Sequence, residues 1–140
     1  AHGERALRSG ALDGCVAFDA AGERIAVSEY TNDAWRVAIL RVSDGAVVAE
    51  PGLGRISGEC WHPSGQYLVA SAPDPSTGRE QLWSIETRAP YARRVLTRME
   101  NGGIHGAAVS RDGRWLAAVA ESDGGATVIF VDLTTALLSV

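Results

Sequence analysis

Residues Cys60 to Trp83 read CWHPSGQYLVASAPDPSTGREQLW, and this stretch decides the fold. A short apolar segment ends at Trp61, a tight turn follows at 62–65, and a second apolar segment runs through Tyr67–Ala70. A polar loop then leads to a third segment, which ends at Trp83. Short apolar runs separated by Gly, Pro and Asp turns are typical of antiparallel strands joined as hairpins.

The same arrangement occurs three times in the chain. The first turns of the three copies end at Gly22, Gly65 and Gly113, which are 43 and then 48 residues apart. The third segments end at Leu40, Trp83 and Val131, and these ends repeat both spacings. In each copy 18 residues separate the turn glycine from the end of the third segment, so the five-residue difference falls between Trp83 and Val109. Landmarks that stay in register through three copies indicate a structural repeat.

Each copy is expected to form four short strands in a hairpin meander. We assign residues 15–57, 58–105 and 106–140 to the three copies, and residues 1–14 to the last strand and exit loop of a preceding copy. The predicted strands are Cys15–Asp19, Arg24–Tyr30, Arg36–Arg41 and Val47–Glu50, then Gly58–His62, Gln66–Ala72, Glu80–Ile85 and Ala92–Thr97, then Gly106–Ser110, Arg114–Glu121, Thr127–Leu133 and a truncated final strand near Leu137–Val140.

The second strand of the third copy has a competing interpretation. Propensity alone predicts a helix over Trp115–Glu121, whereas the repeat places this segment in register with the strands 25–28 and 68–71. We favour the strand, because packing overrides propensity. Leu116 and Ala118 alternate with Ala117 and Val119, so both faces of the strand are apolar and both must be covered. Sheets stacked face to face around an axis satisfy this requirement, and four-stranded units of about 40–50 residues arranged in this way are propeller blades.

The motifs resemble the blades of WD-repeat and TolB-like β-propellers over nearly the whole chain. The turn WHPSG at 61–65 and the strand YLVA at 67–70 are similar to the turn and strand of TolB-like blades, and the turns VSRDG at 109–113 and FDAAG at 18–22 are weaker forms. The third strands QLWSI at 81–85 and IFVDL at 129–133 resemble the strand that ends in Trp-Asp in WD repeats. No Gly-His pair precedes the copies, and the expected turn aspartate is replaced by Ala34, Thr77 and Gly125. The resemblance implies an all-β propeller segment of about three four-stranded antiparallel blades in an incomplete ring.

Composition excludes several classes of function. The chain is 46% hydrophobic with a net charge of −4, so it can bury a core. Its arginines are scattered among acidic residues, which argues against a nucleic-acid surface. No apolar run approaches the ~20 residues of a membrane span. Two cysteines, Cys15 and Cys60, occupy different positions of the repeat and are expected to be buried free thiols. The sequence leaves the compartment open and slightly favours the cytoplasm.

No catalytic or metal-binding pattern emerges from the histidines and glycines. His62 lies in a turn and His105 in a connection at the opposite end of the blade, so we do not expect them to share a metal or a proton. Neither a serine-hydrolase motif nor a phosphate-binding glycine motif is present. We therefore predict no catalytic residues, no metal site and no cofactor.

Binding is expected on the loops at one end of the blades, because the second-to-third-strand loops and the connections between blades share that end. Aromatic and arginine side chains are enriched at interface hot spots. An alternative for Trp35 is that it packs against the neighbouring blade. The candidate binding residues are Tyr30, Trp35, Arg55, Glu59, Arg79, His105 and Asp123.

An open arc of three blades would expose two apolar faces, because propellers close with about four to eight blades. We expect either that the chain is a segment of a larger propeller or that further copies of it complete a ring. The expected function is non-catalytic binding of a protein or peptide, without nucleic acid or a membrane span. The alternatives are the propeller portion of a larger hydrolase similar to prolyl oligopeptidases, or of a TolB-like envelope protein.

Overall fold

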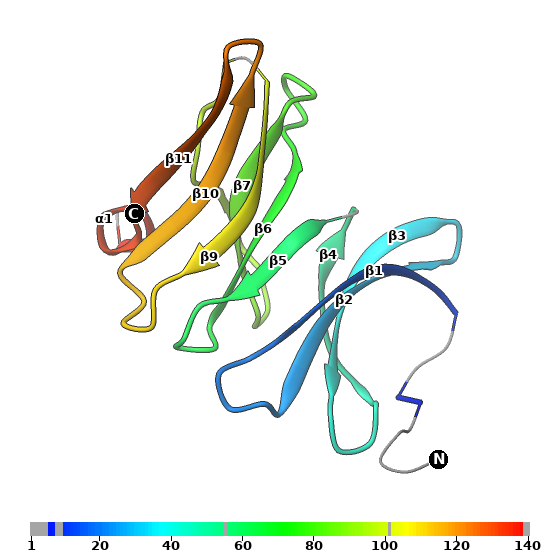
Figure 1. The fold of residues 1–140 in the computed structure, drawn as a ribbon. Coiled ribbons are helices and arrows are strands. Elements are labelled where there is room, and N and C mark those ends of the chain that lie inside the picture. Colours follow the sequence, from blue (N-terminus) through cyan, green and yellow to red (C-terminus); the bar gives the residue numbers. More distant parts are fainter. Residues whose placement is uncertain (1–5, 8–9, 55, 101, 139–140) are drawn as a thin grey trace.

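The computed structural model describes residues 6–7, 10–54, 56–100 and 102–138, and within them every side chain except those at positions 11, 13–15, 53, 59, 105, 137 and 138. This part of the chain forms eleven strands and one short helix (Figure 1). Blade one contains β1 (Ala11–Phe18), β2 (Arg24–Thr31), β3 (Ala34–Arg41) and β4 (Val47–Leu53); blade two contains β5 (Ser57–Trp61), β6 (Tyr67–Pro73), β7 (Glu80–Glu86) and β8 (Arg93–Val95); blade three contains β9 (Gly103–Val109), β10 (Trp115–Ser122) and β11 (Gly125–Asp132), followed by α1 (Leu133–Leu138).

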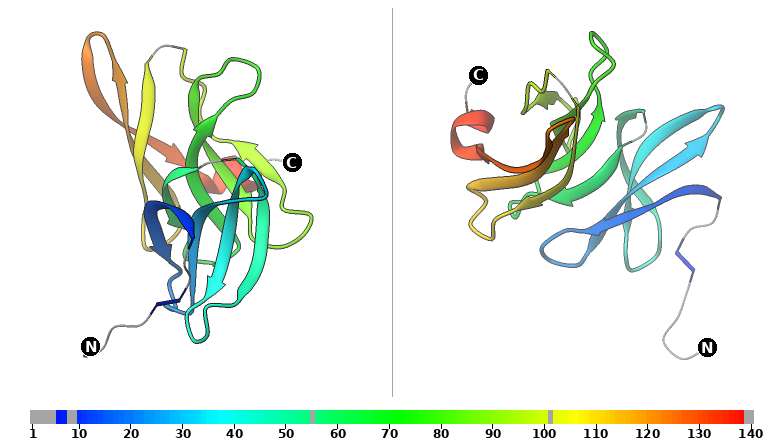
Figure 2. Two further views of the ribbon diagram at one scale, coloured as in Figure 1. Left: turned by 90° about the vertical axis from the view of Figure 1, so that its right-hand side faces the viewer. Right: turned by 45° about the horizontal axis from the view of Figure 1, so that its top comes forward.

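Each blade is one antiparallel meander in which strands pair in chain order. The three sheets follow one another in space as they do in sequence, and the first strands β1, β5 and β9 lie beside each other (Figures 1 and 2). The predicted all-β propeller segment is therefore confirmed. The competing helix over residues 115–121 is wrong, because this segment is β10 and pairs with both β9 and β11.

Two predictions at the ends of the chain need correction. The truncated strand near Leu137–Val140 is wrong for Leu137 and Leu138, which belong to α1, while residues 139–140 lie outside the described part. Helix α1 starts directly after β11, with Leu133 fully buried, so the sheet of blade three has three strands. At the other end β1 begins at Ala11, four residues before the predicted start at Cys15. The strand predicted to precede it lies mostly outside the described residues, and Ala6 and Leu7 are not in a strand.

The three turns after the first strands have the same backbone geometry. Each turn glycine donates its N–H to the carbonyl three residues earlier, at 3.0, 2.9 and 2.9 Å in blades one, two and three. The φ angles of Gly22, Gly65 and Gly113 are 70°, 73° and 77°. This left-handed conformation favours glycine because a side chain there is strained. The sequence register of 43 and 48 residues therefore corresponds to a repeated structural turn.

The hydrophobic core lies between the blades. One cluster joins Ala26, Val37 and Ile39 of blade one to Leu68 and Ala70 of blade two. A second cluster joins the opposite face of blade two to blade three through Val69, Leu82, Leu116 and Ala118. Successive residues of β6 thus pack on different neighbours, which explains why both faces of the second strands are apolar.

Hydrogen bonds tie consecutive blades together at both ends of each boundary. At one end the Ser28 hydroxyl donates to the Ile56 carbonyl at 3.2 Å, and the equivalent Ser71 hydroxyl donates to the Ile104 carbonyl at 3.1 Å. At the other end the carbonyls of the turn glycines are the acceptors: Arg24 donates to Gly65 at 3.1 Å, and Nε2 of His62 lies 2.9 Å from the Gly113 oxygen. The repeat in the sequence is therefore also a repeat of contacts between blades.

The outward faces of the arc are exposed to different extents. On blade three Phe130, Val128 and Trp115 are exposed, with 69% of Phe130 accessible. On blade one Val16 and Phe18 of β1 are exposed, but Val27, Ala38 and Leu40 farther from the axis are buried in a cluster of their own. The predicted exposure of two apolar faces thus holds for most of the outer face of blade three, where Ala117 and Val119 are half-buried, and is confined to the first strand on blade one.

Candidate functional site

The antiparallel topology sorts the loops into two groups. The loops that join second to third strands, and the connections from one blade to the next, lie at one end of the blades, which we call the loop end. The turns after the first and third strands lie at the opposite end, which we call the turn end. The loop end was predicted to carry the binding residues, and the structure has hollows at both ends.

At the loop end of blade one, Tyr30 and Trp35 form an aromatic pair. They are cross-strand partners in the β2–β3 hairpin, and their rings meet edge to face with centroids 5.6 Å apart. The hairpin closes through Asn32 and Asp33 with φ angles of 51° and 62°, as a two-residue type I′ turn requires. Tyr30 is 43% exposed and Trp35 is half-buried, so the pair presents aromatic surface beside a rigid turn.

Arg79 lines a hollow of about 360 Å³ at the loop end of blade two, between the β6–β7 loop and the connection to blade three. The wall is held by Gln81, whose side-chain oxygen accepts hydrogen bonds from the Thr97 hydroxyl at 2.7 Å and the Met99 N–H at 2.9 Å. Across the hollow, hydrogen bonds from the Ser76 backbone and then its hydroxyl lower the pKa of Asp74. The hollow therefore combines the exposed guanidinium of Arg79 with the ionised carboxylate of Asp74. The hydrogen bonds to Gln81 fix the backbone of its wall.

The remaining predicted residues have different outcomes. Asp123 is exposed at the tip of the β10–β11 hairpin. Arg55 lies outside the described residues. The prediction that Glu59 and His105 lie on connections between blades is wrong, because they lie within β5 and β9; their side chains are not described. The structure thus places Tyr30 and Trp35 together, and Arg79 on a separate hollow of the neighbouring blade.

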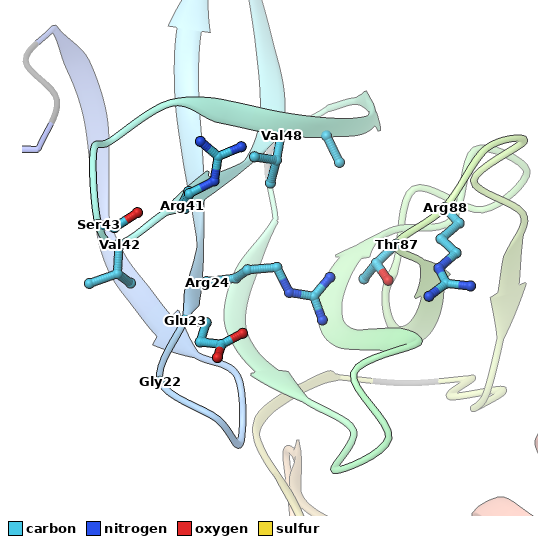
Figure 3. Close-up of a pocket in the computed structure, with 10 residues that line it drawn as sticks. Gly22, Glu23, Arg24, Arg41, Val42, Ser43, Val48, Thr87 and Arg88 are labelled. Atoms are coloured by element: carbon cyan, nitrogen blue, oxygen red, sulfur yellow. The ribbon is translucent and has the colours of Figure 1, made fainter.

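A larger cleft, of about 720 Å³, lies at the turn end between blades one and two (Figure 3). Its polar lining comes from Glu23 and Arg24 beside the first turn of blade one, Arg41 at the end of β3, and Thr87 and Arg88 just after β7. Val42, Val48 and Ala49 supply an apolar wall. The sequence analysis did not identify this cleft. A usable signal was the position of Arg24, Arg41 and Arg88, each directly next to a turn at the same end of its blade.

Arg24 is the anchored cation of the cleft. Its Nε donates to Asp19 at 3.0 Å, its Nη2 donates to the Gly65 carbonyl, and its guanidinium carbon lies 4.7 Å from the centre of the Trp61 ring. Burial raises the pKa of Asp19, but hydrogen bonds from the backbone and side chain of Arg24 and from Glu23 outweigh it, and the net pKa lies below the ordinary value. Asp19 is therefore a carboxylate behind Arg24, with its side chain only 6% exposed.

The other two arginines of the cleft are less constrained. Arg41 pairs with Asp44 at 2.7 Å, and both side chains are about half exposed, 50% and 51%. Exposed pairs of this kind contribute little to stability and exchange readily with other partners. Arg88 is exposed, and its side chain has no hydrogen bond or ion pair to another described residue. Figure 3 shows Arg24 reaching across the cleft toward Thr87 and Arg88.

The residues that the structure describes contain no group of three His, Cys, Asp or Glu side chains that could hold a metal ion. His62 hydrogen-bonds to Ser64 and to the Gly113 carbonyl, so both its ring nitrogens are used within the turn end. Cys60 forms no disulfide and is half-buried rather than buried as predicted, and the side chain of Cys15 lies outside the described ones. No helix in the described segments has the length and hydropathy needed to cross a bilayer.

Comparison with solved structures identifies the class of fold. No protein-family model matches the sequence, and no curated protein matches it. Solved structures do match. TolB from Acinetobacter baumannii is 18% identical with a TM-score of 0.71, over 89% of this chain and 31% of that one. A putative TolB from Agrobacterium tumefaciens is 14% identical with a TM-score of 0.73, over 89% of this chain and 47% of that one.

The β-propeller domain of the Trilobed protease from Pyrococcus furiosus is a third match, 12% identical with a TM-score of 0.64, over 89% of this chain and 40% of that chain. The chain thus spans between about a third and a half of the length of these structures. At such identities the likeness establishes the fold alone. The chain has a TolB-like β-propeller fold, of which it forms three consecutive blades.

Proposed function

We propose that the chain is a non-catalytic propeller segment that binds a protein or peptide through the loop end of its blades. The observation that carries the proposal is the aromatic pair at the tip of the β2–β3 hairpin, in which Tyr30 is exposed and Trp35 is half-buried. Aromatic side chains held in one conformation provide large contact area at little entropic cost, and they dominate the free energy of many interfaces. Further blades of a larger propeller, or copies of this chain, would cover its exposed blade faces.

The test starts from a phage-displayed peptide library selected against the purified chain. Trp35→Ala is expected to lower the affinity for the selected peptides about tenfold or more, as truncation of a hot-spot aromatic residue does. Trp115→Ala is a matched control, because Trp115 is an exposed tryptophan on the outer face of blade three. Isothermal titration calorimetry measures both variants. Equal losses, or no loss with Trp35→Ala, would contradict the proposed site.

A second candidate function is that the blades belong to a larger hydrolase or to a TolB-like envelope protein. The similarity to the propeller of a protease and to two TolB structures favours this alternative. The WD-repeat resemblance remains a sequence-based prediction. An assay of the chain with chromogenic peptide amides separates catalysis by the blades from catalysis elsewhere. Turnover by the purified chain would overturn the non-catalytic assignment.

A further inference from the structure

We propose that the turn-end cleft between blades one and two binds an extended acidic peptide through its carboxylates. This site lies at the opposite end of the blades from Tyr30 and Trp35. Its volume of about 720 Å³ falls within the range of roughly 300–1,000 Å³ typical of ligand pockets. Binding of such a peptide depends on which charges of the cleft face it.

The cleft presents three guanidinium groups and one carboxylate. Arg24, Arg41 and Arg88 line it together with Glu23. Asp19 neutralises Arg24 from behind, but its side chain is buried and does not line the cleft. Asp44 pairs with Arg41 in an exposed geometry that a ligand carboxylate can replace, and it does not line the cleft either. A ligand therefore meets mainly N–H donors.

Arg88 is the most available of the three donors. Its side chain has no hydrogen bond or ion pair to another described residue. A guanidinium forms paired, charge-assisted hydrogen bonds with a carboxylate. Arg24 is held by Asp19, Gly65 and Trp61 and is already oriented across the cleft (Figure 3). Arg24 and Arg88 can therefore bind neighbouring carboxylates of one ligand. Because Arg24 is already held in place, it loses little side-chain entropy on binding.

The apolar wall makes a peptide a better fit than a small anion. Val48 is 41% exposed, and with Val42 and Ala49 it forms one side of the cleft. Val48 and Ala49 belong to β4, the edge strand of its sheet. An extended segment in which acidic and aliphatic side chains alternate can place carboxylates on the arginines and methyl groups on the valines. Edge strands are common docking positions for such segments.

Glu23 opposes this binding, so removal of its charge and removal of an arginine charge should have opposite effects on affinity. It is exposed and lines the same cleft as the arginines, so its charge repels a ligand carboxylate. The net charge of the chain is −4, so long-range attraction does not assist an acidic ligand. Removal of the Glu23 charge should therefore strengthen binding, while removal of the Arg88 charge should weaken it.

The probe is a fluorescein-labelled peptide of alternating Glu and Val, compared with the same peptide carrying Gln for Glu. Fluorescence anisotropy should show binding of the Glu peptide only, weakened about tenfold by Arg88→Gln and strengthened about threefold by Glu23→Gln. Arg111→Gln, which removes an exposed arginine in the first turn of blade three, outside the cleft, should leave affinity unchanged. Circular dichroism checks that each variant folds; the exposure of Arg88 makes a folding defect unexpected.

Three outcomes would overturn the proposal: no binding of the Glu peptide, equal binding of the Gln peptide, or equal effects of Arg88→Gln and Arg111→Gln. The result is independent of the loop-end proposal, because a peptide that depends on Trp35 should be insensitive to Arg88→Gln. Raising the salt concentration to about 0.5 M should weaken the Glu peptide strongly, because exposed charge pairs are screened.

Discussion

The outward face of blade two and the outward face of blade three are made of equivalent positions, yet one is buried and the other exposed. Leu82 of β7 pairs with Ser71, and Val128 of β11 pairs with Val119, which is the equivalent of Ser71 in the repeat. Leu82 is 0% exposed, whereas Val128 is 60% exposed. Blade three covers the first face, and no described residue covers the second to the same extent. The apolar residues on both of its faces suit a blade to packing between two neighbouring blades. Large apolar residues on its outer face therefore mark an interface between blades.

The largest expected effect comes from cutting back the buried member of this pair. Leu82→Ala should lower the free energy of unfolding by about 2–5 kcal/mol, because it leaves a cavity between blades two and three. Val128→Ala, at the exposed equivalent position, should change it by less than about 0.5 kcal/mol, as exposed substitutions do. Urea unfolding followed by far-ultraviolet circular dichroism measures both. Equal losses would mean that the face of blade three is also covered in solution.

The next largest effect concerns the turn position at which the blades differ in charge. Asp19, His62 and Ser110 occupy equivalent places, but only Asp19 is a buried carboxylate that accepts hydrogen bonds from Arg24 and the Glu23 N–H. Asp19→Asn should cost about 1.5–3 kcal/mol at neutral pH, because the charge-assisted hydrogen bonds are lost. The pKa of Asp19 in the folded chain lies below its ordinary value of 3.8.

The sign of the pH effect follows from this shift. The carboxylate stabilises the fold above about pH 4, and this stabilisation disappears as the pH falls through the lowered pKa. The gap between wild type and Asp19→Asn should therefore shrink between neutral pH and about pH 3 in urea titrations. A gap that stays constant or widens in acid would contradict the role assigned to Asp19.

A smaller effect is expected for the serine ties between blades. Ser71→Ala removes the hydroxyl proton that the Glu80 carboxylate and the Ile104 carbonyl share as acceptors, at a cost of about 1 kcal/mol in unfolding free energy. Val119, the equivalent residue of blade three, is the matched control: Val119→Ser should have little effect because no following blade offers an acceptor within the described chain. Thermal unfolding compares the two. A penalty for Val119→Ser as large as that for Ser71→Ala would show that the two faces are alike.

The smallest effect on stability, but a specific one on association, is expected for Phe130→Asp. A charge in the middle of the outer face of blade three should leave the unfolding free energy nearly unchanged. It should abolish any concentration-dependent association of the chain through this face. Sedimentation velocity over a range of concentrations measures the change, with Arg79→Asp at the loop end as the control. Association that persists in Phe130→Asp would exclude this face as the contact.

The sequence predicted the repeat and the turns well because they depend on local chemistry. The sequence shows the turn glycines at 22, 65 and 113, and their φ angles are positive in the structure. It also shows the apolar residues on both faces of β6. The end of blade three was not readable, because Leu133–Leu138 is made of residues that suit a helix as well as a strand. Leu133 is buried in the cluster between blades two and three, and this long-range packing is not visible in the sequence.

The candidate sites were predicted less completely. Tyr30 and Trp35 were identified from residue type and position in a hairpin, and their pairing follows from the register of β2 and β3. The turn-end cleft was missed because Arg24 and Arg88 come from different blades, 64 positions apart in the chain. Only the stacking of blade one on blade two brings both arginines to one cleft. This proximity depends on packing between blades and cannot be recognised from local sequence.

The ties between blades have one more consequence, which concerns how the molecule opens. The Ser28–Ile56 and Arg24–Gly65 hydrogen bonds link only the first two blades, and the Ser71–Ile104 and His62–Gly113 contacts link only the second and third. Detachment of blade three therefore breaks one boundary and leaves the other whole, as in a linear array. Thermal fluctuations should peel the molecule apart from its terminal sheet inward, with the middle blade as the last to lose its amide protection.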